Sequence, residues 1–140
     1  MATFDTSLKS RLIYVFAISD EWHKDCLKVG ETTLEEDDGN FPLPNSELLN
    51  KAACARIDQY TQTAGIAYNL LYTEMTVFFK GGTISSFNDK QVHNVLERSG
   101  VKKKVFDTVK GANEWFCCDL ETVKKAILAV KNGQNSLNAS

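Results

Sequence analysis

Six side chains in this sequence carry groups that could act together on a phosphodiester bond: Tyr14, Lys28, Arg56, Asp89, His93 and Glu97. The last three recur every four residues, so a helix would place them on one face. A carboxylate on that face can hold a divalent cation, because such hard ions prefer oxygen ligands. The cation and an arginine can offset charge on the phosphate, while a phenol or amine takes a proton from the attacking water. The set suits metal-dependent phosphodiester hydrolysis, provided that the fold brings its members together.

Each of these side chains also has an ordinary structural interpretation. Tyr14 can be a core residue with a hydrogen-bonded hydroxyl, and Lys28 can extend its amine to water. Arg56 falls among residues expected to face inward, where an arginine needs an ion pair because an unpaired buried charge is costly. Glu97 can form a salt bridge with nearby lysines. Residue types and spacing alone leave both interpretations open.

The phenol and the amine fall in a stretch that predicts a β-hairpin. Residues 12–18 form a continuous apolar run rich in β-branched and aromatic side chains, which predicts a strand buried on both faces. Residues 19–25 are polar and predict a turn. Residues 26–32 predict a second short strand, which ends near Gly30. The hairpin would hold the phenol on one strand and the amine on the other.

A helix and a long strand are predicted after the hairpin. The helix covers residues 47–61, with Ser46 as its N-cap. Its inward side is expected to carry five residues at helical spacing: Leu49, Ala52, Ala53, Arg56 and Tyr60. The strand covers residues 68–80, and Gly81 and Gly82 end it.

Two more helices are predicted in the remainder of the chain. One has Asn88 or Ser86 as its N-cap, carries an apolar stripe and stops at Gly100. A short aromatic segment follows at residues 114–118. Asp119 then caps a final amphipathic helix over residues 120–131.

The predicted order is β-β-α-β-α, then a short strand or turn, then α. It indicates an α/β (α+β) fold in which helices pack against a small antiparallel three-stranded sheet. We expect a lead-in at residues 1–10 and one domain at residues 11–132, which includes an acidic and proline-containing insertion loop at residues 34–45. Residues 133–140 are predicted to be a flexible tail.

Charge is distributed unevenly along the chain. The formal net charge of −2 makes no general case for nucleic-acid binding. A basic run could nevertheless form an electrostatic footprint for phosphates, with these members: Arg98, Lys102, Lys103, Lys104 and Lys110. Residues 31–38 include an acidic run. Either run can equally be a solvated face.

The cysteines and the absence of long apolar stretches bear on location. Cys26 and Cys54 are isolated and Cys117 and Cys118 are adjacent, so no zinc-binding spacing is present. The N-terminus lacks the apolar region of a secretion signal, and no segment approaches the roughly 20 apolar residues of a membrane helix. We therefore expect a cytoplasmic protein with no membrane segment, whose thiols are reduced and mostly buried.

Five short motifs occur in a characteristic order over nearly the whole chain. The runs Ile13-Tyr14-Val15 and Leu27-Lys28-Val29-Gly30-Glu31-Thr32 lie on the predicted hairpin, and Arg56 lies on the helix that follows. Asp89-Lys90-Gln91-Val92-His93 places an acidic residue one turn before a histidine, and Glu114-Trp115-Phe116 precedes the last helix. In order and spacing these motifs resemble the GIY-YIG nuclease superfamily, especially its phage-type branch.

This resemblance implies a metal-dependent DNA endonuclease with a GIY-YIG-like fold. By the resemblance, Tyr14 would position or deprotonate the attacking water. Lys28 stands where most relatives have a tyrosine, and it would help to activate water or steady the phosphate. Arg56 would contact the scissile phosphate.

The resemblance also assigns roles on the second helix and implies partners. Asp89 would hold Mg²⁺ or Mn²⁺, with Glu97 as the runner-up ligand, and His93 would relay a proton or serve as a structural group. The implied partner is DNA, with no membrane. The resemblance further implies that the chain is the nuclease module of a restriction or phage-defence protein, because such domains are often fused to or associated with helicase or methyltransferase modules. Cleavage of both strands would call for a homodimer or two successive events.

The chain departs from the branch pattern at four positions. Leu12 replaces the glycine of the first motif and Leu27 a frequent tyrosine, while Asp89 is shorter than the common glutamate. Glu31 stands where arginine is frequent, and negative charge beside a DNA groove is unfavourable unless it points away. These departures support an alternative in which the same fold has a degraded site and binds nucleic acid or protein without cutting.

Overall fold

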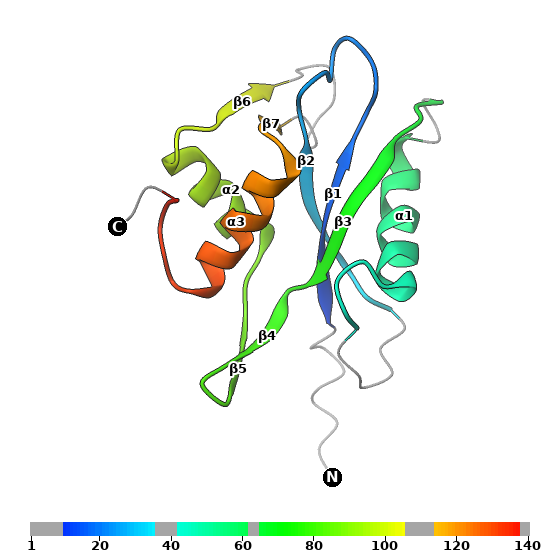
Figure 1. Cartoon of the computed structure of the whole chain (residues 1–140). Helices are drawn as coiled ribbons and strands as arrows, with labels where there is room; N and C mark the ends of the chain where they lie inside the picture. Colours follow the sequence, from blue (N-terminus) through cyan, green and yellow to red (C-terminus); the bar gives the residue numbers. More distant parts are fainter. Residues whose placement is uncertain (1–9, 36–41, 62–64, 106–113, 138–140) are drawn as a thin grey trace.

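The computed structural model describes residues 10–35, 42–61, 65–105 and 114–137, which form three helices and small antiparallel sheets (Figure 1). The elements in chain order are β1 (Arg11–Ala17), β2 (Lys28–Thr33), α1 (Glu47–Thr61), β3 (Asn69–Met75), β4 (Val77–Lys80), β5 (Thr83–Ser86), α2 (Asp89–Arg98), β6 (Lys102–Val105), β7 (Glu114–Cys117) and α3 (Leu120–Lys131). The predicted α+β class is confirmed at this level.

Strand β1 is the middle of a three-stranded antiparallel sheet with the order β2-β1-β3. Its residue Tyr14 lies opposite Gly30 of β2 and Thr73 of β3. The five residues from Leu12 to Phe16 are all buried, because helices cover both faces of the sheet. The prediction of a strand buried on both faces is therefore confirmed.

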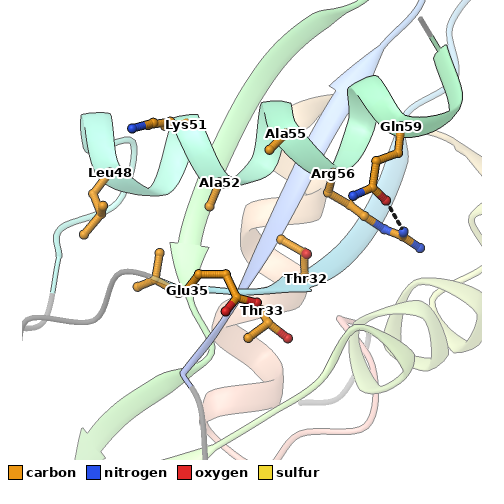
Figure 2. A pocket seen from close by; sticks show the side chains of 10 residues that line it. Thr32, Thr33, Glu35, Leu48, Lys51, Ala52, Ala55, Arg56 and Gln59 are labelled. Atoms are coloured by element: carbon orange, nitrogen blue, oxygen red, sulfur yellow. Dashed lines mark hydrogen bonds between the residues drawn. The ribbon is translucent and has the colours of Figure 1, made fainter. Parts of the chain in front are cut away.

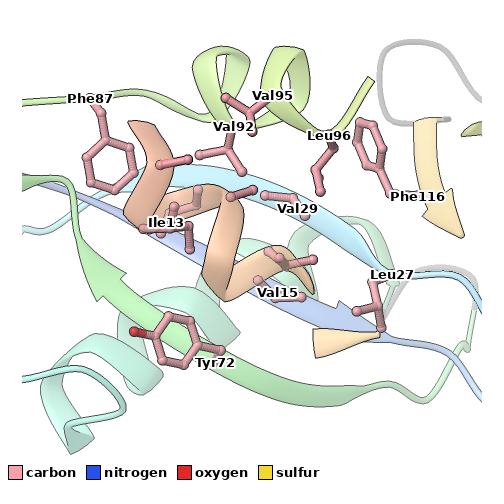
Figure 3. Close-up of a cluster of buried hydrophobic side chains, with 14 residues drawn as sticks. Ile13, Val15, Leu27, Val29, Tyr72, Phe87, Val92, Val95, Leu96 and Phe116 are labelled. Carbon is pink, nitrogen blue, oxygen red and sulfur yellow. The ribbon is translucent and has the colours of Figure 1, made fainter. Parts of the chain in front are cut away.

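The sheet separates two apolar clusters. Leu12 and Phe16 point toward α1 and pack there with Leu49. Ile13 and Val15 point the other way and pack with residues of α2 and α3 (Figure 3). Figure 1 shows the same division, with α1 on one side of the sheet and α2 and α3 on the other. Each fully buried side chain of this size stabilises the fold by about 1.5–3 kcal/mol, so the alternation along β1 fixes both layers.

The inward side of α1 agrees only in part with the prediction. Leu49, Ala53, Ile57 and Thr61 are buried at a spacing of four, whereas Arg56 is exposed. The expectation that Arg56 faces inward was wrong. Alanines and short side chains fill the middle of this helix, so the apolar pattern leaves its rotational phase poorly defined.

Helices α2 and α3 begin at the predicted caps. The side chain of Asn88 accepts a hydrogen bond of 2.9 Å from the main-chain N–H of Gln91. Asp119 Oδ1 accepts one of the same length from the N–H of Thr122. Both bonds satisfy N–H groups that the first turn of a helix leaves unpaired.

The predicted long strand over residues 68–80 is divided in two. Its break lies at Thr76, whose N–H and hydroxyl both donate to the carbonyl of Arg11. After the break, β4 pairs with β5 in a hairpin that the sequence reading missed. Gly81 and Gly82 form its two-residue turn with φ angles of 60° and 80°, a conformation that favours glycine.

Strands β6 and β7 form a separate antiparallel pair beside the start of β2. Lys102, Lys103 and Lys104 of the basic run lie on β6. Leu27 forms an antiparallel bridge to Phe116 of β7. This bridge joins the β6-β7 pair to the three-stranded sheet.

The last described residues pack on the domain. The N–H of Leu137 donates to Ser99 Oγ at 2.8 Å, and its side chain packs against the cluster between the sheet and α2 and α3. Leu137, within the predicted tail, therefore contacts the domain, and the flexibility of residues 133–140 stays a prediction. Other predicted features lie outside the described residues: 1–9, 36–41, Lys110, 138–140 and the side chain of Tyr60.

Candidate functional site

The six residues singled out in the sequence lie in two groups on either side of β2. Cross-strand partners share a face, so Lys28, opposite Phe16, lies on the face covered by α1, as does Tyr14. Arg56 projects from α1 itself. The other group belongs to α2, on the opposite face. β2 is an edge strand of this sheet. Asp89 and His93 contact it from one face, and Arg56 lines a hollow beside its end from the other.

Tyr14 is held tightly beneath the second motif. Its side chain is only 3% exposed. A Cβ added to Gly30 would lie 2.6 Å from Tyr14 Cζ and 2.6 Å from Oη, so only glycine leaves room for the ring. The glycine of the second motif therefore lets the phenol lie flat against β2. Lys28, one pleat away on the same strand face, is half-buried.

Arg56 lines a hollow of about 260 Å³ between α1 and the end of β2 (Figure 2). Its Nη1 donates to Gln59 Oε1 at 2.7 Å. Thr32, Thr33 and Glu35 form the opposite wall. The guanidinium of Arg56 is thus exposed. Its hydrogen-bond partner, Gln59, is neutral, so this contact does not neutralise the positive charge.

Asp89 meets an acidic residue of β2. It is the first residue of α2, and its N–H donates to Glu31 Oε1 at 2.8 Å. Arg11, across the strand pair, forms an ion pair with the other oxygen of Glu31. Burial is the main cause that raises the pKa of Asp89, and His93 opposes this rise. The negative charge of Glu31 and a side-chain hydrogen bond to Glu31 raise the pKa further. The two carboxyl groups therefore share a site that disfavours two negative charges.

His93 fastens α2 to the same strand one turn further on. Its Nε2–H donates to the carbonyl of Val29 at 2.8 Å, which fixes the tautomer if the ring is neutral. The ring centroid lies 5.0 Å from that of Phe116 on β7. His93 is thus held between β2 and β7, and it keeps the start of α2 against β2, which forms this rim of the sheet.

Glu97 points to a different neighbour. Its Oε2 accepts a hydrogen bond of 3.2 Å from Lys103 Nζ. This is the salt bridge with a nearby lysine that the sequence offered as the structural interpretation of Glu97. Its side chain is 43% exposed. In the basic run, Lys104 Nζ donates to the carbonyl of Trp22 at 2.8 Å, and Lys102 and Arg98 are exposed.

The structure brings together some of these residues and keeps others apart. Asp89 and His93 border the same segment of β2, while Arg56 and Tyr14 lie on the other face. The hydrogen bond of Arg56 goes to Gln59 on its own helix. In the sequence, Glu31 stands out as a departure from the branch motif and as part of an acidic run. Its contact with Asp89 was not predicted, because a contact between residues so far apart in the chain leaves no periodicity.

The donor set at Asp89 bears on metal binding. No group of three or more His, Cys, Asp or Glu side chains suited to a metal ion occurs within the described residues. Two carboxyls do meet, and Mg²⁺ is commonly bound by one or two carboxylates together with water and substrate phosphates. Burial is the main cause of the raised pKa of Asp89, and a cation would oppose the repulsion by Glu31 that adds to it. The pair therefore offers two carboxyl groups of the kind that a hard divalent cation prefers, one oxygen of Glu31 being paired with Arg11.

The chain was compared with known proteins, and no family model, curated protein or solved structure matches it. Among the described helices, none is long and apolar enough to cross a membrane. The functional inference therefore depends on the motifs and on the geometry of this rim.

Proposed function

We propose that this chain is a divalent-cation-dependent endonuclease domain of the GIY-YIG kind, which hydrolyses phosphodiester bonds in DNA. The observation that supports the proposal best is the meeting of Asp89 with Glu31 at the rim of β2, one turn from His93. The β2-β1-β3 sheet, with helices on both faces, agrees with the fold that the motifs imply.

In this proposal Asp89 and Glu31 hold Mg²⁺ or Mn²⁺. When bound, the ion supplies a Lewis acid for a phosphate oxygen and lowers the pKa of a water molecule. Glu31 keeps Asp89 in place through the N–H contact, and Arg11 limits the negative charge at the pair. His93 positions this pair by anchoring α2 to Val29.

The α1 face supplies positive charge beside the end of β2. Arg56 contacts the scissile phosphate from its exposed position and stabilises the charge that develops there. Lys28 steadies the phosphate from the same side. Tyr14 acts by holding the second motif at Gly30, because a side chain that is 3% exposed is poorly placed to exchange protons with bulk water.

One observation favours a second function, a DNA-binding module that does not cut. Arg11 already provides a positive charge at Glu31, so the carboxyl pair can be satisfied without a metal ion. Under this alternative, the exposed lysines of β6 bind DNA, and the Asp89–Glu31 pair has no catalytic activity. Salt-sensitive binding with intact DNA would support it.

The test is cleavage of supercoiled plasmid by the full chain in Mg²⁺ or Mn²⁺. Arg56→Ala and Asp89→Ala are each expected to lower the rate by about 100-fold or more. Lys125→Ala and Glu121→Ala, matched charge removals at exposed positions of α3, should cut as the unmodified chain does. Circular dichroism melts establish that the variants are folded. Equal cleavage by both rim variants would overturn the proposal.

A further inference from the structure

Two cysteines face each other where β2 approaches β7. Leu27 and Phe116 form a bridge with N–H to carbonyl distances of 2.8 and 2.9 Å. The next pair outward is Cys26 and Cys117, whose Sγ atoms are 3.5 Å apart. The neighbour of a hydrogen-bonded antiparallel pair is a non-hydrogen-bonded pair, with Cα atoms about 4.5 Å apart. That spacing lies within the range of roughly 4.4–6.8 Å that disulfides span.

The two thiols differ in their access to solvent. Cys117 is exposed, whereas Cys26 is buried, with 3% of its surface accessible. Burial raises the pKa of Cys26 to about 11, and the contact with Cys117 adds to this effect. A dissolved oxidant therefore reacts with Cys117 first, and Cys26 is the resolving thiol that reacts with the oxidised Cys117.

We propose that Cys26 and Cys117 form a reversible oxidation site that closes to a disulfide on reaction with a hydroperoxide. The geometry of the pair carries this inference, and it does not depend on the proposed nuclease function. The Sγ atoms need to approach from 3.5 Å to about 2.05 Å, a movement that side-chain rotation can supply.

The chemistry balances in two steps. The Cys117 thiolate attacks one peroxide oxygen, so an S–O bond forms, the O–O bond breaks, and hydroxide leaves and takes up a proton. The sulfur of Cys26 then attacks the sulfenic sulfur, an S–S bond forms, the S–O bond breaks, and the proton of Cys26 leaves with the oxygen as water. Two thiols and one hydrogen peroxide give one disulfide and two water molecules.

The bond would join the start of β2 to the end of β7. The same two strands hold His93, through the carbonyl of Val29 and the ring of Phe116. Oxidation would therefore fix the spacing of the two strands that position this histidine. Of the other thiols, Cys54 is on α1, whereas Cys118 directly follows Cys117 in the sequence and is half-buried.

The test treats the reduced full chain with hydrogen peroxide and digests it with trypsin without reductant. The intact chain should lose the mass of two hydrogen atoms, and the peptide of residues 25–28 should be linked to that of residues 111–124. Dithiothreitol should reverse the change. The second peptide contains both Cys117 and Cys118, so variants must identify the partner.

Cys118→Ser and Cys54→Ser are the matched controls and should form the link as the unmodified chain does. Cys117→Ser, at an exposed position, should abolish it, and Cys26→Ala should do the same if the buried position tolerates the change. A link that survives in Cys117→Ser would overturn the proposal. So would a bond between Cys117 and Cys118, or oxidation of Cys117 to the sulfinic acid while Cys26 stays a thiol.

Discussion

The main-chain N–H of Asp89 donates a hydrogen bond of 2.8 Å to Oε1 of Glu31. This contact ties the first turn of α2 to the edge strand β2 and brings two carboxyl groups together. Placing a carboxylate next to another is unfavourable unless a proton or a cation intervenes. The proposed function assigns that role to a divalent cation.

Asp89 should make stability depend on pH in a defined direction. Its pKa is raised in the folded chain, so the folded state binds more protons than the unfolded state between the two pKa values. The contribution to stability is full below the unfolded pKa and is lost as pH rises through the folded pKa. The free energy of unfolding of the unmodified chain should therefore increase relative to Asp89→Asn as pH falls, measured by urea unfolding. Parallel pH profiles would contradict this.

Gly30→Ala should destabilise the fold through Tyr14. The added Cβ would lie 2.6 Å from the ring, which is enclosed by the cluster under α1. Overpacking of this kind costs about 1–3 kcal/mol, which thermal or urea unfolding can measure. Thr32→Ala, on the same strand face, is the control and should cost less. In a Tyr14→Ala background the effect of Gly30→Ala should shrink, and an unchanged effect would show that the ring is not the cause.

Removal of Arg11 should strengthen cation binding. Arg11→Gln takes away the positive charge that pairs with Glu31, so the carboxyl pair becomes more negative and attracts Mn²⁺ more strongly. Calorimetric titration of Mn²⁺ into the chain measures the change, and Lys125→Gln is the control for loss of one charge elsewhere. Weaker binding in Arg11→Gln would favour the non-cutting alternative, in which arginine is the intended partner.

The basic strand β6 should contribute to DNA affinity through charge alone. Lys102 is exposed, so Lys102→Ala should remove about one phosphate contact. The slope of log affinity against log salt concentration should then become shallower by about 0.9 for duplex DNA. Fluorescence anisotropy over a salt series gives the slope, and Lys125→Ala should leave it unchanged. An unaltered slope in Lys102→Ala would place the DNA elsewhere.

The sequence was most informative where local chemistry decides the structure. The caps at Asn88 and Asp119 and the apolar run of β1 led to the correct elements, because each depends on residues close in the chain. The break at Thr76 could not be foreseen, since it depends on hydrogen bonds to Arg11 across the fold. The Gly81-Gly82 turn was recognisable as a hairpin signal but was interpreted only as a strand end.

The candidate site was harder to predict than the fold. Helical spacing correctly put Asp89 and His93 on one face, toward β2. It did not reveal that Glu31 is their neighbour, or that Cys26 faces Cys117, because both are contacts between distant parts of the chain. The expectation that the thiols are mostly buried also failed, since of the four only Cys26 is buried.

The most direct test of the central claim is an anomalous-diffraction map from crystals of the full chain soaked in Mn²⁺. If Asp89 and Glu31 together hold the cation on which cleavage depends, a peak should appear between their carboxyl groups and disappear in Asp89→Ala. Glu97→Ala should keep the peak, because Glu97 is paired with Lys103. A peak at Glu97, or no peak at the Asp89–Glu31 pair at saturating Mn²⁺, would contradict the account.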